Sequence, residues 1–245
     1  MQPRLVSSAG GGQTSQLYAN NSVSDTARNQ TSELFFQRLF SERPTNPGVF
    51  LGDLHGMNAV QHSLQKDILP ALARNGVKIL FLEMVKAEDQ KFLEQFQRDG
   101  DKLKLRKYFV DSGWDKGNDP EDKNSAWVDQ LVATCAKARD LGITLVGIDI
   151  KNSGLTRLET SNPAWRDVIM QTLANHPKGT RYAVFGGVGH SANYPFNQGV
   201  DRLLNIPSVD FAPQQEGGVP RETTTGKFQR GDGKNSDYIY LLPAN

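Results

Sequence analysis

The stretch RYAVFGGVGH, residues 181–190, indicates both the fold and the place of a site. It begins with the apolar run YAVF, which is typical of a strand buried on both faces of a sheet. It then replaces side chains by glycine and ends on His190. An earlier stretch, VFLGDLHG at residues 49–56, has the same order of features and contains His55. The repetition favours a shared site over two unrelated flexible turns.

Apolar strands alternate with helical patterns along most of the chain. The four core strands are predicted at residues 48–55, 77–84, 143–150 and 181–190. Helices are predicted at residues 32–44, 57–76, 87–100, 125–142 and 162–179. A short helix at residues 198–205, a short strand at 207–212 and a closing strand at 237–242 follow. This alternation predicts an α/β fold with a mostly parallel central sheet and helices on both faces.

The domain organisation follows from composition. Residues 1–31 are rich in Gly, Ser, Asn and Gln and lack apolar periodicity, so they are expected to be a flexible polar tail. Residues 32–245 are expected to form a single α/β domain. Residues 102–124 are charged and are predicted to be irregular, and residues 214–236 a long loop. Loops of this length often bind a ligand or a partner, which makes 111–124 and 214–236 candidate contact segments.

Charge and hydropathy exclude several classes of partner. The formal net charge is +1, so no basic excess points to a nucleic acid, and no apolar run approaches the ~18 residues of a membrane span. The N-terminal residues lack the apolar core of a secretory signal, and a soluble chain is expected. The single cysteine, Cys135, lies in a helical pattern and is interpreted as a buried thiol rather than a nucleophile. The oligomeric state does not follow from these features.

Polar side chains gather where the predicted core strands end. The residues at these ends are Asp53 and His55, Glu83, Asp149, and His190. In an open α/β sheet, ligands bind outside the carboxyl ends of the strands. Apolar strands are a poor place for so many titratable side chains unless those side chains converge. We therefore expect them to form one site.

Two chemistries suit this set of side chains. A divalent ion such as Zn²⁺, Mn²⁺ or Fe²⁺ would take His55, Glu83, His190 and Asp149 as ligands. The alternative is a metal-free acid–base site, in which imidazole is the base and the carboxylates orient it.

Glycine and arginine residues add to the predicted site. Gly52, Gly187 and Gly189 lack Cβ atoms beside it, so the backbone could adopt positive φ, approach a ligand and offer N–H groups to an anion. Arg166, near the start of the predicted helix 162–179, is either an anion clamp or a surface residue.

Together these residues resemble the Tiki superfamily, which groups Tiki-type metalloproteases, TraB-like proteins, erythromycin esterases, ChaN-like haem-binding lipoproteins and a module of large bacterial toxins. The superfamily pattern has two Gly-x-x-His motifs, an acidic residue ending the second strand and an Arg on a later helix. The matching stretches are GDLH at 52–55, FLEM at 81–84, NPAWRDVIM at 162–170 and GVGH at 187–190. Asp53 is a departure, because the esterase and ChaN-like branches usually have Glu there. Residues 185–209 are most similar to the toxin-borne branch, as in the Pasteurella multocida toxin.

The resemblance implies a bacterial effector or toxin domain that is secreted into a host cell; without that implication a cytoplasmic location is expected. It further implies a metal-dependent hydrolase of a peptide, ester or phosphate bond. In this hypothesis His55, Glu83 and His190, with Asp53 or Asp149, hold the metal or activate water, and Arg166 stabilises the developing anion.

Two other functions stay open at this point. One is a non-catalytic module of the same fold that binds metal or, less expectedly, haem through its imidazoles. The other is an effector that acts by binding a host protein through its two long loops. The sequence does not specify the substrate, whether a host protein or a small molecule.

Overall fold

The computed structural model of the chain describes residues 31–115, 125–150, 157–191, 197–212, 227–231 and 236–242. The polar tail predicted for residues 1–31 lies outside these ranges except for Thr31. Most of the two loops predicted to make contacts also lies outside them, at residues 116–124, 213–226 and 232–235.

Within the described ranges, the strands form one seven-stranded sheet in the order β3-β2-β4-β1-β5-β7-β6. The strands are β1 (Gly48–Asp53), β2 (Val77–Lys86), β3 (Thr144–Asp149), β4 (Arg181–Gly187), β5 (Ser208–Ala212), β6 (Lys227–Arg230) and β7 (Tyr238–Leu241). All neighbouring pairs are parallel except β6 and β7, which pair antiparallel at one edge. The prediction of an α/β fold with a mostly parallel sheet is confirmed.

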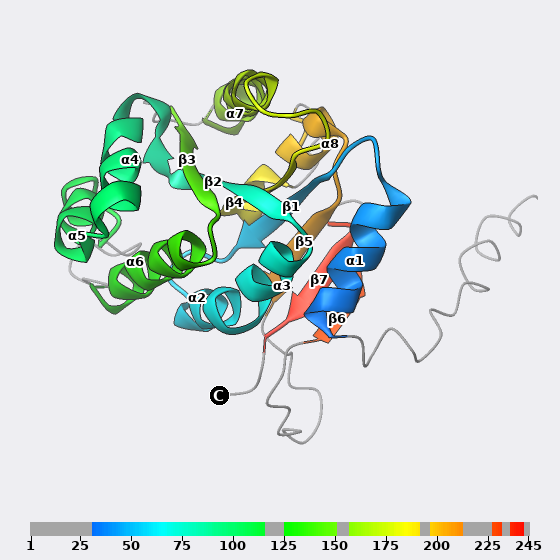
Figure 1. Cartoon of the computed structure of the whole chain (residues 1–245), viewed down its shortest axis with the longest axis horizontal. Helices are drawn as coiled ribbons and strands as arrows, with labels where there is room; N and C mark the ends of the chain where they lie inside the picture. Colours follow the sequence, from blue (N-terminus) through cyan, green and yellow to red (C-terminus); the bar gives the residue numbers. More distant parts are fainter. Residues whose placement is uncertain are drawn as a thin grey trace, which may run out of the picture.

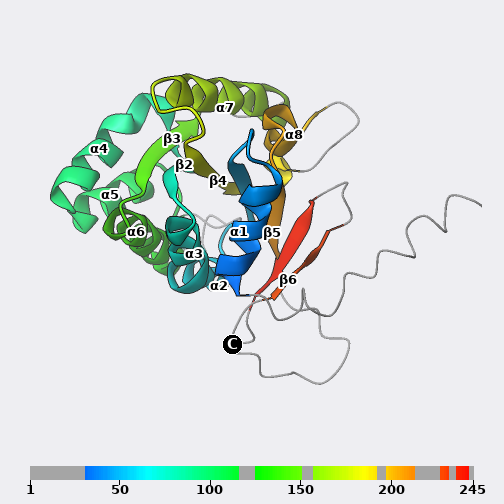
Figure 2. The ribbon, with the colours of Figure 1, turned by 45° about the vertical axis from the view of Figure 1, so that its right-hand side comes forward.

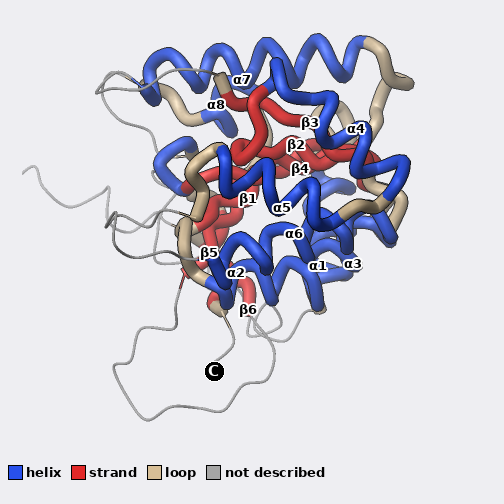
Figure 3. Tube along the Cα trace, turned by 90° about the vertical axis from the view of Figure 1, so that its left-hand side faces the viewer, coloured by secondary structure: helices blue, strands red, loops and turns tan. Residues whose placement is uncertain are grey.

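Helices cover both faces of this sheet (Figures 1 and 2). They are α1 (Ser32–Glu42), α2 (Asn58–Ser63), α3 (Leu69–Arg74), α4 (Gln90–Asp99), α5 (Lys102–Asp111), α6 (Ser125–Asp140), α7 (Arg157–Ala174) and α8 (Val200–Leu204). Figure 3 shows α7 and α8 above the strands, and α1, α2, α3 and α6 below them. Among the described helices, none has the length and apolar character needed to cross a bilayer.

Side-chain alternation along β2 divides the core into two layers. Leu80 and Leu82 pack in the larger cluster, with α1 to α6, whereas Ile79 and Phe81 pack in the smaller cluster, with α7 and α8. Successive residues of a strand point to opposite faces, so this division follows directly from the strand period. Glu83 comes next in the alternation, within the buried run from Ile79 to Val85 near the carboxyl end of β2.

A bulge lies in β2 at this point. Leu82 pairs with Gly147 of β3, but the next pair is Lys86 with Asp149, so β2 has two extra residues between these pairs. The bulge breaks the alternation, because Met84 and Val85 both pack in the larger cluster. Bulges re-aim side chains, and here the irregular segment is the one that carries Glu83.

The structure corrects the prediction that residues 102–124 are irregular, because residues 102–111 form helix α5. Gly100 ends α4 in the left-handed region with φ 72°, and the Asp101 carboxylate then accepts hydrogen bonds from the N–H groups of Leu103 and Lys104. A Gly stop followed by an Asp cap allows a new helix to begin at once. The charged residues of this segment lie on the exposed face of an amphipathic helix.

Other boundaries also differ from the predicted ones. Strand β6 occupies part of the predicted loop 214–236, and α7 begins at Arg157 rather than near residue 162. The predicted helix 57–76 contains a π-helical turn at Leu64–Ile68, where the Leu69 N–H donates to the Leu64 carbonyl. Pro70 lies two residues after this turn and has no N–H to donate to the preceding turn, which is a known cause of local irregularity.

We expect truncation of Leu82 to destabilise the domain strongly. Leu82 is fully buried in the central part of β2, and Leu→Ala in a core costs about 2–5 kcal/mol. Leu103→Ala is the matched control, since Leu103 on α5 is 79% exposed and should change the free energy of unfolding by less than about 0.5 kcal/mol. Urea denaturation of both variants tests this, and equal losses would contradict the assignment of the core.

Candidate active site

The predicted rim residues converge on the carboxylate of Glu83. Its Oε2 accepts a hydrogen bond from the Gly187 N–H at 2.6 Å and lies 3.3 Å from His55 Nε2. Its Oε1 lies 3.0 Å from Arg157 Nη2 and 3.4 Å from His190 Nε2. Both imidazoles therefore meet one buried carboxylate, as the sequence predicted for His55, Glu83 and His190.

The two histidines reach Glu83 from different aromatic surroundings. The His55 ring meets Trp114 and Trp127 edge-on, at centroid distances of 5.5 and 6.1 Å. The His190 ring stacks on Trp165 of α7, with centroids 3.9 Å apart and planes at 22°. Side-chain exposure differs as well, at 36% for His55 and 5% for His190. His55 is therefore the imidazole that a ligand can contact.

His55 is held as an imidazolium by two carboxylates. Its Nδ1 lies 2.9 Å from Asp53 Oδ2, and its Nε2 faces Glu83. Burial disfavours the charged ring, but the hydrogen bonds to Asp53 and Glu83 and their charges outweigh burial and raise the pKa of His55 from 6.5 to about 10. At neutral pH the ring is thus a charged donor at both nitrogens.

The pKa values of the carboxyl groups in the cluster are shifted in opposite directions. Burial disfavours an ionised Glu83, yet hydrogen bonding and charge from His190 and His55 hold the pKa of Glu83 well below its ordinary value of 4.5. Burial raises the pKa of Asp53, against the opposing effect of His55. Burial also raises the pKa of Asp149, against the charge of Arg157. Glu83 is therefore the most firmly ionised acid of the cluster.

Asn162 fixes the proton on one nitrogen of His190. The Asn162 amide nitrogen donates to the Gln198 carbonyl at 2.9 Å, which turns its oxygen toward His190 Nδ1 at 2.6 Å. An amide oxygen only accepts, so Nδ1 carries the hydrogen and Nε2 is the nitrogen left facing Glu83. Asn162 is fully buried; it begins the stretch NPAWRDVIM, of which only Arg166 was predicted to belong to the site.

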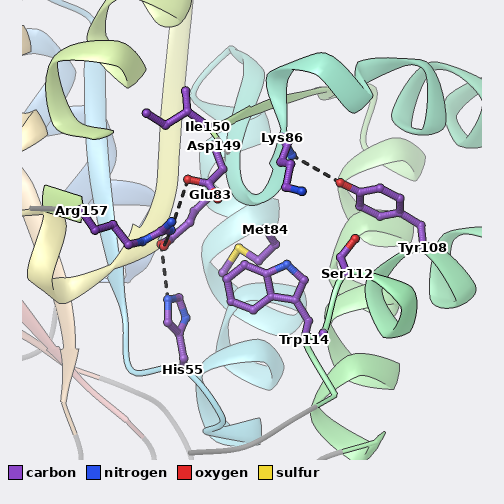
Figure 4. Close-up of a pocket in the computed structure, with 11 residues that line it drawn as sticks. His55, Glu83, Met84, Lys86, Tyr108, Ser112, Trp114, Asp149, Ile150 and Arg157 are labelled. Atoms are coloured by element: carbon purple, nitrogen blue, oxygen red, sulfur yellow. Dashed lines mark hydrogen bonds and ion pairs between the residues drawn. The ribbon is translucent and has the colours of Figure 1, made fainter. Parts of the chain in front are cut away.

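Arg157, rather than Arg166, provides the guanidinium of the site. Arg157 Nη2 lies between the carboxylates of Glu83 and Asp149, 3.2 Å from Asp149 Oδ1 (Figure 4). Arg166 lies two turns further along α7 and pairs with Asp167 at 2.6 Å on the exposed face of that helix. The structure therefore does not bring Arg166 into the cluster. The only sequence signal for Arg157 was its position shortly after the end of the third core strand.

The arrangement of these donors does not fit a divalent ion. Arg157 already bridges Glu83 and Asp149, and the remaining ligand candidates contact each other directly. Over the described ranges, no group of three His, Cys, Asp or Glu side chains has the arrangement of a metal site. Both nitrogens of His55 face carboxylates, which leaves no free ring nitrogen there for haem iron either. Metal and haem binding by His55, Glu83, His190 and Asp149 stay untested predictions.

The predicted glycines make room for the protein's own side chains. A Cβ on Gly187 would lie 2.9 Å from His55 Nε2, and one on Gly52 would collide with the Asp210 carboxylate. Gly189 has open space around it, with Leu158 Cδ2 the nearest atom at 3.9 Å. None of the three has positive φ, and none lines the cavity beside the cluster. The anion that the Gly187 N–H binds is Glu83 itself.

A cavity of about 760 Å³ opens beside the cluster. Figure 4 shows the side chains that surround it. They come from the turn after β1, from the ends of β2 and β3, from the start of α7, and from the end of α5 with the turn after it: His55, Glu83, Met84, Lys86, Tyr108, Ser112, Gly113, Trp114, Asp149, Ile150 and Arg157. His190 and Asp53 lie behind this surface. A ligand would therefore meet His55, Glu83 and Arg157 directly.

Comparison with protein families identifies the chain. The family model described as "Type III effector protein HopBA1" matches residues 44–220, which is more than half of the sequence. The chain belongs to the HopBA1 family of type III effectors. No curated protein sequence matches it.

Solved structures confirm the fold of this HopBA1-family chain. The type III effector HopBA1 itself superposes with a TM-score of 0.63 at 18% identity, over 89% of this chain and 96% of the other. RRSP, a MARTX toxin effector domain from Vibrio vulnificus, gives 0.53 at 15% identity over 90% of this chain and 40% of the other. The Pasteurella multocida toxin C-terminal region gives 0.56 at 12% identity over 94% and 28%. The likeness to the toxin-borne branch is thereby confirmed at the level of the fold.

We expect the stability of this HopBA1-family chain to fall as pH rises from about 6.5 to 10. The folded pKa of His55 is raised above its ordinary value of 6.5, so its stabilising effect is complete below pH 6.5 and is lost as pH passes the folded pKa of about 10. Urea midpoints across this range measure it. His55→Gln should flatten the decline, and exposed His62→Gln should not; identical slopes in all three proteins would contradict the ion pairs.

A methyl group at Gly187 should displace His55. Gly187→Ala places a Cβ 2.9 Å from His55 Nε2, which forces the ring away from Glu83, so the pKa of His55 should fall toward its ordinary value. Gly189→Ala, which meets only Leu158 at 3.9 Å, should leave it raised. NMR titration of the imidazole signals measures both variants. An unchanged pKa of His55 in Gly187→Ala would show that the contact is not as tight as described.

Proposed function

We propose that the domain hydrolyses an acyl bond, in a peptide or an ester, without requiring a bound metal, and that it does so as an effector delivered into a host cell. The observation that carries this proposal is the convergence of His55, Glu83 and Arg157 at one end of a cavity of about 760 Å³. The delivery is supported by the type III effector family to which the chain belongs.

The charges of the site favour an acyl bond over a phosphate. Within the cluster, the charges of Glu83 and Asp149 already balance those of His55 and Arg157, so a phosphoryl dianion would bring excess negative charge beside the two carboxylates. A tetrahedral acyl intermediate carries one negative charge on oxygen. The imidazolium of His55 and the guanidinium of Arg157 are donors suited to such a charge, in a partly desolvated place where electrostatic stabilisation is strong.

Glu83 and His55 divide the proton transfers. Glu83 is ionised and is the group that accepts a proton from an attacking water. His55 is charged and donates a proton to the leaving group. The contact between the two side chains, 3.3 Å, is longer than the 2.6 Å bond from Gly187 N–H to Glu83. Catalytic contacts are often long before substrate binds, and a water can enter as this one opens. Asn162 and His190 act as positioning residues behind Glu83.

The test is the appearance of new peptide termini in a host-cell extract after incubation with the full chain. Glu83→Gln should lower their yield by about 10²- to 10⁴-fold, the usual contribution of an acid or base. His62→Gln is the control, because His62 is exposed and does not line the cavity. A chelator should leave the yield unchanged if no metal is required. Equal yields from wild type and Glu83→Gln, or hydrolysis of a simple phosphate ester alone, would overturn the proposal.

The pH profile provides a second test once a cleaved peptide is known. With Glu83 as base and His55 as acid, kcat/KM should be level through neutral pH and fall as pH passes about 10, where His55 loses its proton. Asp53→Asn removes one carboxylate from His55 and should move this fall to lower pH by about one unit or more. A fall that does not move in Asp53→Asn would show that another group is the acid.

Binding of a host protein without turnover is the second candidate function. The cavity could serve recognition alone, as the sequence left open. Loss of host-cell effects in Glu83→Gln, with unchanged binding of the same host proteins, would separate catalysis from binding.

A further inference from the structure

Lys86 is a charged residue of the cavity that the proposed chemistry does not use. It is the last residue of β2, it is half-buried, and it lines the cavity together with Arg157. Arg157 pairs with Glu83 and Asp149, but the Lys86 ammonium forms no ion pair within the described residues. Its backbone N–H, 3.4 Å from the Tyr108 hydroxyl, holds the strand end against α5 (Figure 4).

A second cavity of about 370 Å³ adjoins the first at this lysine. Lys86, Tyr108 and Ser112 line both cavities. The second cavity runs over α4 and α5, on the side of the sheet edge formed by β3. A ligand longer than one residue can thus extend from Glu83, past Lys86, into the groove between these two helices.

The groove combines an apolar surface with a charged rim. Its apolar residues are Phe92, Phe96 and Leu105, of which Phe92 is 37% exposed. Two rim lysines are paired, since Lys104 lies 3.3 Å from Asp101 and Lys107 lies 2.7 Å from Asp111, and Asp99 adds a further carboxylate to the rim. Asp89 accepts a hydrogen bond from the Tyr108 hydroxyl at 3.1 Å. Among the described residues that line this path, Lys86 is therefore the cation that forms no ion pair.

We propose that Lys86 binds an acidic side chain of an extended peptide substrate, close to the bond that is cleaved. This inference rests on the proposed acyl hydrolysis and specifies its substrate. A half-buried ammonium gains most from a carboxylate or phosphate, because a charge-assisted hydrogen bond is about twice as strong as a neutral one.

The groove favours a polypeptide over other polymers. It offers an apolar surface for one side chain and, immediately beside it, a cation for another. An extended peptide can present an apolar and an acidic side chain close together, because its residues are spaced about 3.3 Å apart. A nucleic acid would repeat its phosphates without apolar side chains, and the rim of the groove carries acidic as well as basic groups.

The experiment is affinity selection with a defined peptide library on the immobilised full chain. Capped hexapeptides with one fixed position carry Glu, phosphoserine, Gln or Lys there, and mass spectrometry identifies the retained peptides. We expect wild type and Glu83→Gln to enrich acidic over Gln peptides by about tenfold or more, as one charge-assisted contact gives. Comparison of Glu with phosphoserine distinguishes a carboxylate from a phosphate as the natural group.

Variants at two lysines of β2 test whether Lys86 causes the preference for acidic peptides. Lys86→Gln should lose the acidic preference and Lys86→Glu should reverse it toward Lys peptides. Lys78→Gln is the matched control, because Lys78 is exposed at the opposite end of β2. Thermal melting confirms that each variant is folded.

The results separate this inference from the proposed function. An acidic preference that survives in Lys86→Gln, or no preference in wild type, would overturn the subsite. A preference that depends on Lys86 while wild type cleaves none of the retained peptides would keep the subsite and overturn the hydrolysis.

Discussion

The burial of the Glu83 carboxylate is the constraint on which the rest of the site depends. An ionised carboxylate removed from water is costly unless charge and hydrogen bonds compensate it. Here the four compensating groups come from three segments of the chain: His55 after β1, the Gly187 N–H and His190 at and just after the end of β4, and Arg157 at the start of α7. Each of these segments must hold its group in contact with Glu83 for the carboxylate to stay ionised. The ionisation of Glu83 therefore depends on the correct packing of the carboxyl edge of the sheet.

The backbone at this edge is shaped for that carboxylate. The bulge in β2 breaks the alternation directly after Glu83, and the glycines of β4 leave space on both faces of their strand. A Cβ on Gly186 would lie 3.1 Å from Glu83 Oε2, and one on Gly187 would crowd His55. Glycine thus replaces core side chains at these positions, and the residues of the ion-pair network occupy the space. The glycines are structural supports of the cluster, which is a different role from cradling a bound ligand.

The sequence predicted the parts of the site that strand periodicity controls. The ends of parallel strands meet at one edge, so the position of Glu83, Asp149 and both histidines along apolar runs was sufficient to place them together. Arg157 and Asn162 lie on a helix, where which side chain reaches the edge depends on the helix start and its rotation. Neither can be read from spacing alone. Residues 102–111 were predicted to be irregular because their charges obscured the buried face of Leu105, Tyr108 and Phe109 on a helix that packs against α6.

Two proteins with the same fold need not have the same catalytic nucleophile, and this chain is an example. The Pasteurella multocida toxin structure is described as having a thiol-protease-like triad, but the single cysteine here, Cys135, is fully buried in α6, and burial raises the pKa of its thiol to about 12. A thiol so placed is neither ionised nor accessible, so it cannot attack a substrate. The proposed hydrolysis therefore uses the imidazole, carboxylates and cations at the sheet edge. In that proposal, an ionised Glu83 and a protonated His55 are assigned the roles of base and acid because their pKa values are shifted in opposite directions.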